Sequence, residues 1–239
     1  MIQQANSLNI FRASGSTQSG RWGMSLFIWA FIAQSFTWAG CQSAEQNSIK
    51  MSEVKEAKEV NYSGKQDTAT LGGGCFWCVE AIYQELKGVI SVTSGYSGGI
   101  EKNPTYKEVS AGITGHAEVI QIVFDPEIVT FEEILEVFFI THDPTTLNRQ
   151  GNDVGPQYRS VIYYHDDEQK AIAQKSKTEF AAEAWEDPVV TEISAFTEFY
   201  KAEDYHQNYY RDNKNQPYCV YVINPKLQKF KKKFATKLN

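Results

Sequence analysis

Residues 72–80 read Gly-Gly-Gly-Cys-Phe-Trp-Cys-Val-Glu. A short strand-like run precedes the three glycines, and residues 76–86 carry the pattern of a helix that Gly88 ends. Cys75 is therefore expected where a glycine turn meets the first turn of a helix. Unpaired backbone N–H groups and the helix dipole favour negative charge there, so we expect a lowered pKa for its thiol. The sequence predicts a reactive thiolate with Cys78 within disulfide reach.

Two structural roles compete with a redox role for this cysteine pair. A zinc site needs a second Cys/His pair at suitable spacing, which Cys219 and a lone histidine do not supply. A structural disulfide across two residues constrains little chain, so it would stabilise the fold only slightly. We therefore favour a redox-active dithiol, although the pair alone does not say which redox reaction it performs.

Strand-like and helical stretches alternate on both sides of the pair. Thr130 and Asp166 each precede a helical pattern and are candidate N-caps. The expected elements are a strand beginning at 69, a helix at 76–86, strands at 89–96 and 116–124, a helix at 131–140, a strand at 160–164, a helix from 166 to about 184, strands at 189–193 and 219–223, and a basic helix after Pro225. This order predicts an α+β fold, a two-layer ferredoxin-like sandwich with a β-α-β-β-α-β core, extended coil and a C-terminal helical extension.

Residues 1–40 have the features of an export leader. Arg12 and Arg21 precede an apolar run at 24–33 that is too short for a comfortable membrane span. The run leads to Trp-Ala-Gly before Cys41, which resembles the lipobox of bacterial lipoproteins. We expect Cys41 to be lipidated and to anchor an exported protein to a membrane, facing the periplasm or the cell exterior. An uncleaved apolar anchor is the alternative, and it also implies export.

Residues 41–67 are polar and contain almost no large apolar side chain, so we expect a flexible tether. Residues 68–239 then form the folded domain. The formal net charge is −6 and the isoelectric point is near 5.3. A nucleic-acid-binding protein normally carries a basic face, so we expect no nucleic-acid partner.

Gly74-Cys75-Phe76-Trp77 resembles the active-site signature of the A-type peptide methionine sulfoxide reductases. Further segments resemble that family in the same order: Asn103–Tyr106, Thr114–Glu118, Gly151–Asp153 with Gln157–Ser160, and Tyr205–Gln207. The resemblance runs from about Thr68 to Tyr218. Several ordered motifs are more specific than any one of them.

The resemblance implies a peptide-methionine (S)-S-oxide reductase that acts on the S epimer of methionine sulfoxide, free or in proteins. Cys75 thiolate would attack the sulfoxide sulfur. Glu118, kept protonated by burial, would give the oxygen its proton. Tyr106 and Tyr158 would hydrogen-bond that oxygen as charge builds on it. No metal and no organic cofactor is implied.

Other residues of the motifs would bind the substrate. Phe76 and Trp77 would form an apolar wall for its methyl group. Gly74 would let the substrate approach the backbone closely. Asp153 would orient Arg159 or the tyrosines. His206 fits a structural hydrogen-bonding role as well as a catalytic one, so we leave it outside the site.

Reduction of the substrate would leave sulfenic acid on Cys75, and a second thiol must then form a disulfide. Cys78 stands where the commonest family pattern has glycine. We predict that it resolves the sulfenic acid because it is closest, with Cys219 as the alternative. The strand expected at 219–223 would hold Cys219 rigidly. A thioredoxin-type dithiol would then reduce the disulfide.

Two other functions compete with this one. A general thiol–disulfide oxidoreductase also uses Cys-x-x-Cys after a strand, but it needs neither Glu118 nor the two tyrosines. An exported binding module has support only from the leader and the tether.

Overall fold

The computed structural model describes residues 60–239. The expected leader, Cys41 and the expected tether up to residue 59 lie outside the described residues. Within the described part, no helix combines the length and apolar character needed to cross a membrane. The helices and strands are β1 (Asp67–Gly73), α1 (Phe76–Tyr83), β2 (Val89–Ser97), α2 (Tyr106–Ser110), β3 (Ala117–Phe124), α3 (Phe131–Thr141), β4 (Arg149–Gln150), β5 (Asp153–Val154), β6 (Ser160–Tyr164), α4 (Asp167–Lys175), α5 (Ala182–Ala184), β7 (Glu192–Ala195), β8 (Phe199–Lys201), α6 (Tyr209–Asp212) and α7 (Asn224–Lys233).

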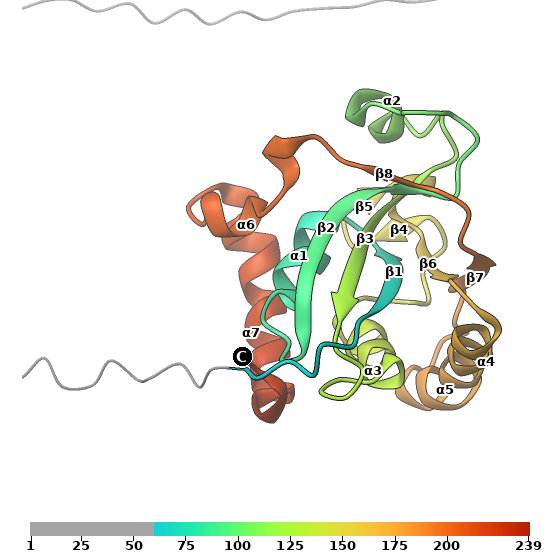
Figure 1. The fold of residues 1–239 in the computed structure, drawn as a ribbon. Helices are drawn as coiled ribbons and strands as arrows, with labels where there is room; N and C mark the ends of the chain where they lie inside the picture. Colours follow the sequence, from blue (N-terminus) through green and yellow to red (C-terminus); the bar gives the residue numbers. More distant parts are fainter. Residues whose placement is uncertain (1–59) are drawn as a thin grey trace, which may run out of the picture. The chain divides into compact units, whose positions relative to one another are not determined.

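Six strands form one sheet in the order β7-β6-β1-β3-β2-β8 (Figure 1). The four inner strands pair antiparallel, and β7 joins β6 in parallel. Along the chain the core elements follow as β1, α1, β2, β3, α3 and β6, with the short α2 inserted between β2 and β3. The predicted ferredoxin-like β-α-β-β-α-β sandwich is therefore confirmed.

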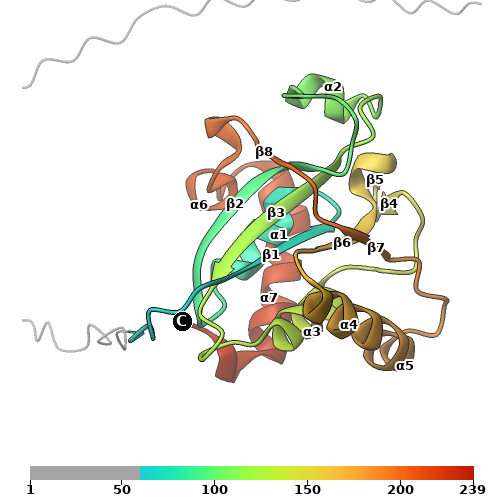
Figure 2. The same cartoon turned by 45° about the vertical axis from the view of Figure 1, so that its right-hand side comes forward.

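Helices α1, α3 and α7 lie on one side of this sheet (Figures 1 and 2). The alternation along β3 explains why: Ile120 and Ile122 belong to the main core, whereas Val119 joins a smaller apolar cluster with Val161 and Tyr163. Successive side chains of a strand point to opposite faces. Glu118 has the same parity as Ile120 and thus points toward the helical layer, where α1 begins.

The helix starts follow from local sequence. Thr130 and Glu133 form a reciprocal capping box at the start of α3, and Asp166 accepts the Gln169 N–H at 2.7 Å at the start of α4. Both predicted N-caps are confirmed. The expected helix from 166 to about 184 is built of α4, one widened π-type segment at 176–181, and α5.

The strand predicted at 189–193 lies later, at 192–195. The Val190 N–H donates to the Pro144 carbonyl at 2.8 Å. Val190 is therefore bonded to a loop, and pairing with β6 starts at Glu192.

The strand predicted at 219–223 is wrong. These residues form a widened helical turn that continues into α7, with the Val220 N–H bonded to the Gln216 carbonyl. The buried residues are Cys219, Ile223, Leu227 and Phe230, a helical spacing. The alternation of Cys-Val-Tyr-Val-Ile suggested a strand, but packing of this stripe against the core decides for a helix.

The end of the expected tether lies against the domain. The Tyr62 hydroxyl donates to the Val89 carbonyl at 3.0 Å, and the Ser63 hydroxyl donates to Asp125 at 2.7 Å. Lys65 forms an exposed ion pair with Glu127. Residues 62–65 are therefore a strap bound to the fold, although composition predicted a free tether as far as residue 67.

Candidate active site

Cys75 lies between β1 and α1 and is the N-cap residue of that helix. The preceding Gly74 has φ +93°, a conformation that favours glycine, and a Cβ there would come within 2.5 Å of Gln150 Cγ. The Cys78 N–H donates to the Cys75 carbonyl at 3.0 Å, which closes the first turn. Strand, glycine and helix start thus fix the cysteine as the sequence predicted.

The ionisation of Cys75 differs from the expectation. Burial raises the pKa of its thiol well above the usual range, and a hydrogen bond with Cys78 and the charge of Glu118 add in the same direction. Only 8 % of the residue is exposed. The predicted lowering is therefore wrong, because loss of solvent outweighs the helix dipole.

Glu118 reaches the start of α1 from β3. Its Oε2 accepts the Phe76 N–H at 3.1 Å, one of the N–H groups that the helix itself leaves unpaired. The residue is 1 % exposed, and burial raises the pKa of its carboxyl to about 8. Since this value lies above 7, most Glu118 is protonated at neutral pH. The structure thus places a neutral acid beside Cys75.

Tyr106 and Tyr158 come to this site from two separate turns. Tyr106 starts α2, and its ring stacks on Phe76 with centroids 6.4 Å apart. Tyr158 ends a 3₁₀ turn that begins at Pro156. Burial, followed by the Glu118 charge, raises the pKa of Tyr106 to about 12 and shifts that of Tyr158 in the same direction. Both therefore keep their hydroxyl protons and can donate hydrogen bonds.

Phe76 and Trp77 form an aromatic surface at the first turn of α1. Phe76 is 1 % exposed and contacts the rings of Tyr96, Tyr106 and His206. Trp77 is half-buried and remains available to a ligand. An apolar surface next to a thiol, a neutral acid and two hydroxyl groups suits a small ligand with one polar oxygen.

A family model described as peptide methionine sulfoxide reductase matches residues 67–238. The chain belongs to this family. The peptide methionine sulfoxide reductase MsrA of Leptospira borgpetersenii serovar Hardjo-bovis is 58 % identical and covers 70 % of this chain and 94 % of its own. The MsrA of Sulfolobus acidocaldarius is 57 % identical over 72 % of this chain and 97 % of its own.

Solved structures of the family have a similar fold. Mxr1 from Saccharomyces cerevisiae in reduced form gives a TM-score of 0.57 at 34 % identity and covers 68 % of this chain and 94 % of its own. Methionine sulfoxide reductase A of Corynebacterium diphtheriae gives 0.57 at 38 % identity, covering 63 % and 77 %. The chain is thus an enzyme, a peptide-methionine (S)-S-oxide reductase.

Asp153 in the reductase has a different partner from the one expected. Its Oδ2 accepts the Tyr218 hydroxyl at 2.8 Å, and that hydroxyl lies 3.8 Å from the Cys78 sulfur. Tyr218 is a site residue that sequence reasoning missed. Its place directly before Cys219 is the one signal in the sequence, and a strand at 219–223 would not bring its hydroxyl to Cys78.

Arg159 instead ties together the backbone around the site. Its guanidinium donates to the carbonyls of Pro156 and Gly115 and to the Tyr163 hydroxyl, and it pairs with Glu192 at 3.0 Å. No bond to Asp153 is among its contacts in the described part of the chain. Arg159 therefore fixes the turn that carries Tyr158 without acting through Asp153.

Both candidate resolving cysteines are buried near the site. Cys78 is 2 % exposed and Cys219 is not exposed at all. The hydrogen bond from Cys75 lowers the pKa of Cys78, whereas burial raises that of Cys219. Cys75, Cys78 and Cys219 are all free thiols in the described part of the chain.

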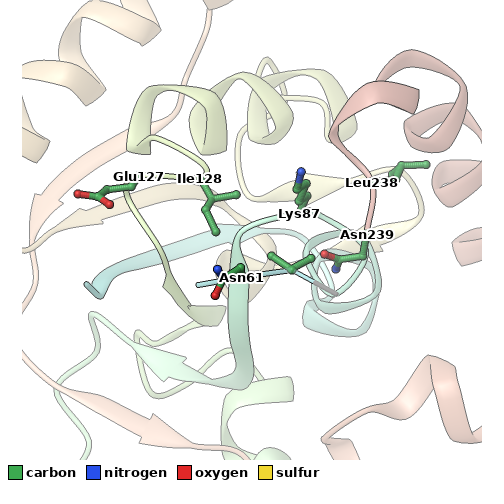
Figure 3. Close-up of a pocket in the computed structure, with 7 residues that line it drawn as sticks. Asn61, Lys87, Glu127, Ile128, Leu238 and Asn239 are labelled. Carbon is green, nitrogen blue, oxygen red and sulfur yellow. The ribbon is translucent and has the colours of Figure 1, made fainter. Parts of the chain in front are cut away.

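A cavity of about 410 Å³ lies elsewhere, beside the point where the described chain begins (Figure 3). Its lining residues are Val60, Asn61, Lys87, Glu127, Ile128, Leu238 and Asn239. None of them belongs to the site around Cys75. Among the described residues no group of three or more His, Cys, Asp or Glu side chains is arranged to hold a metal ion.

Proposed function

We propose that the reductase converts the S epimer of methionine sulfoxide, free or in proteins, to methionine through a covalent step at Cys75. The observation that supports this most directly is the buried Glu118 held at the start of α1, beside the buried thiol, where burial raises the pKa of its carboxyl to about 8. A sulfoxide oxygen is a poor leaving group until it gains a proton. The site holds an acid that can supply one at neutral pH.

The first step balances within the site. Cys75 thiolate forms a bond to the sulfoxide sulfur while Glu118 transfers its proton to the oxygen. Tyr106 and Tyr158 stabilise the charge on that oxygen by donating hydrogen bonds. The oxygen then moves to the Cys75 sulfur as sulfenic acid, the S–O bond and the transient S–S bond to the substrate break, and methionine leaves with its sulfur reduced by two electrons. The thiol proton of Cys75 replaces the one that Glu118 gave.

The second step regenerates the thiol. Cys78 sulfur attacks the Cys75 sulfenic acid, a disulfide forms and water leaves. Cys78 is favoured because it lies in the same helical turn, and its lowered pKa makes thiolate more available. A thioredoxin-type dithiol then reduces the disulfide and is itself oxidised. Cys219 remains the alternative resolving residue.

Purified enzyme and separated sulfoxide epimers test the chemistry. We expect loss of the S epimer alone, and loss of activity by at least about a hundredfold in Glu118→Gln, because the variant has no proton to give. Single-turnover rates in the native enzyme should fall above pH 8 as the carboxyl ionises. Cys75→Ser must abolish sulfoxide consumption; residual activity in this variant would refute the mechanism.

Disulfide mapping tests the second step. After one equivalent of sulfoxide we expect a Cys75–Cys78 bridge, and a Cys219→Ser variant should form it at an unchanged rate. A Cys75–Cys219 bridge that forms first would overturn the assignment.

Family membership decides against a general thiol–disulfide oxidoreductase, which has no use for a neutral carboxyl or paired tyrosines at its thiol. The variants Glu118→Gln and Tyr158→Phe test whether turnover depends on the carboxyl and the tyrosine hydroxyl. Unaltered turnover of both would favour that rival function.

We further propose that residues 1–40 are a leader, that Cys41 carries the lipid and that residues 68–239 form the catalytic domain of an exported, membrane-anchored enzyme. The lipobox-like Trp-Ala-Gly-Cys supports this. Mass spectrometry of the membrane-associated protein should find a lipidated N-terminal Cys41, and Cys41→Ser should release the enzyme from membranes. A protein that begins at Met1 in the cytosol would contradict the proposal.

A further inference from the structure

Two residues of segment 203–209 contact the side chain of Trp77. The Tyr209 ring lies flat against the indole, with centroids 3.7 Å apart and planes at 9°. On another side the indole Nε1–H donates to His206 Nδ1 at 3.2 Å, and the two ring centroids are 5.5 Å apart. Stacking limits the indole to one plane, and the hydrogen bond fixes its rotation within that plane. Together they hold a half-buried tryptophan in one orientation.

The hydrogen bond specifies the chemical form of His206. Its Nδ1 can accept only when the imidazole is neutral and carries its proton on Nε2. The residue is 2 % exposed, and Nε2 has no hydrogen-bond partner in the described part of the chain. Glu203 Oε2 lies 3.9 Å from it. The imidazole is thus buried with only one of its two nitrogens bonded, and that bond goes to Trp77.

The segment is itself fixed at several points. Gln207 exchanges hydrogen bonds with both backbone groups of Ser94, and the buried Glu80 accepts the Asn208 N–H at 3.0 Å. Glu203 accepts the Tyr106 N–H and the Tyr96 hydroxyl, each at 2.9 Å. The segment is therefore braced against β2, α1 and the start of α2. A residue on it can act as a rigid support for Trp77.

We propose that His206 is a positioning residue that fixes the indole of Trp77 and thereby sets the size of the pocket for the S-methyl group. This rests on the proposed function, in which Phe76 and Trp77 form the wall for that group. Phe76 is already buried on several sides and needs no further support. Trp77 is half-buried, and its hydrogen bond to His206 limits the movement of the indole. The His206 ring also lies 4.3 Å from that of Tyr106, so one side chain supports the methyl wall and a proposed oxygen-binding residue.

A change in the preference between two substrates reports the position of the Trp77 indole more specifically than a change in activity does. A fixed wall should accept an S-methyl and resist an S-ethyl group, since one methylene in a fitted pocket is worth about tenfold or more in kcat/KM. In His206→Leu the indole N–H loses its acceptor and the wall loosens. In His206→Asn the Oδ1 atom lies close to the former Nδ1 position and can accept the same bond.

The test uses the full chain and the S epimers of methionine sulfoxide and ethionine sulfoxide. For each variant, kcat and KM of sulfenic acid formation are measured with both substrates. We expect His206→Leu to reduce the methyl-to-ethyl ratio of kcat/KM at least about threefold, mainly through a higher KM for the methyl substrate. His206→Asn should restore the ratio to within about twofold of the native value. His165→Leu is the matched control, because His165 bonds Thr70 and stacks on Phe196 away from the site.

The outcomes separate this inference from the proposed function. An unchanged ratio in His206→Leu, together with a lower ratio in Trp77→Ala, overturns the role of His206 and leaves the methyl wall intact. An unchanged ratio in both variants removes the wall itself and the inference with it. Should His206→Leu fail to fold, His206→Phe keeps a ring and removes the acceptor, and an unchanged ratio there overturns the inference equally.

Discussion

At the scale of single residues, the site depends on which groups burial leaves neutral. Glu118 combines nearly complete burial with one backbone N–H donor, and burial has the larger effect on its pKa. A fold that keeps a carboxyl protonated gives up stability, because the unfolded chain releases the proton more readily.

Glu118→Gln should therefore stabilise the enzyme at neutral pH. With a folded pKa of about 8 against the ordinary 4.5, the native carboxyl costs about 3 kcal/mol at pH 7. This penalty is absent below pH 4.5 and grows as the pH rises to 8, where it levels off. The free energies of unfolding of the native enzyme and of Glu118→Gln, measured with urea at pH 4.5 and pH 7.5, check this prediction. If the two proteins differ by the same amount at both pH values, the carboxyl is ionised in the fold.

Gly74 is the second residue whose identity the site requires. Gly74→Ala adds a clash with Gln150 to the strain of a positive φ, so we expect a loss of about 2–4 kcal/mol in the free energy of unfolding. Gly64→Ala is the matched control, since its φ is +87° and a Cβ there meets nothing within 4 Å. It should cost only the backbone strain, about 1 kcal/mol. Equal losses, measured by urea unfolding, would mean that Gln150 moves aside freely.

Among the elements, the turn at 219–223 differs most from its prediction and buries a thiol. Alternating apolar letters suggested a strand, but the turn continues into α7 and buries Cys219 beneath it. We expect the turn to open locally before this thiol reacts, whereas Cys78 already shares the first turn of α1 with Cys75.

Alkylation of the reduced enzyme should report this difference. We expect iodoacetamide to modify Cys75, which keeps some exposure, well before the fully buried Cys219. Peptide mapping over time gives the order, and a denatured sample supplies the rate for unprotected thiols. If Cys219 is labelled as fast as Cys75, the turn opens readily. That result would support Cys219 as the resolving residue.

At the scale of the whole molecule, the strap at 62–65 makes part of the expected linker a component of the fold. Asp125 is completely buried and accepts bonds from the backbone and the hydroxyl of Ser63. Removal of the strap would leave that carboxylate with fewer donors.

A chain that begins at residue 67 should therefore be less stable than one that begins at residue 60. We expect a loss of about 1–3 kcal/mol, seen as a lower Tm, with little change in the rate of sulfenic acid formation. Ser63→Ala in the longer chain should reproduce part of the loss. Identical melting curves for the two chains would show that the strap contributes nothing.

The core order of strands and helices, both N-caps and the place of Cys75 were predictable from the amino-acid sequence, because they depend on short-range periodicity and on turn and capping chemistry. Its ordered motifs also indicated the family. Four features required the folded structure: the pKa of Cys75, the helical state of 219–223, the docking of 62–65, and the contacts of Asp153, Tyr218 and His206. Each of these depends on burial or on partners that are distant along the chain, and local pattern carries no record of either.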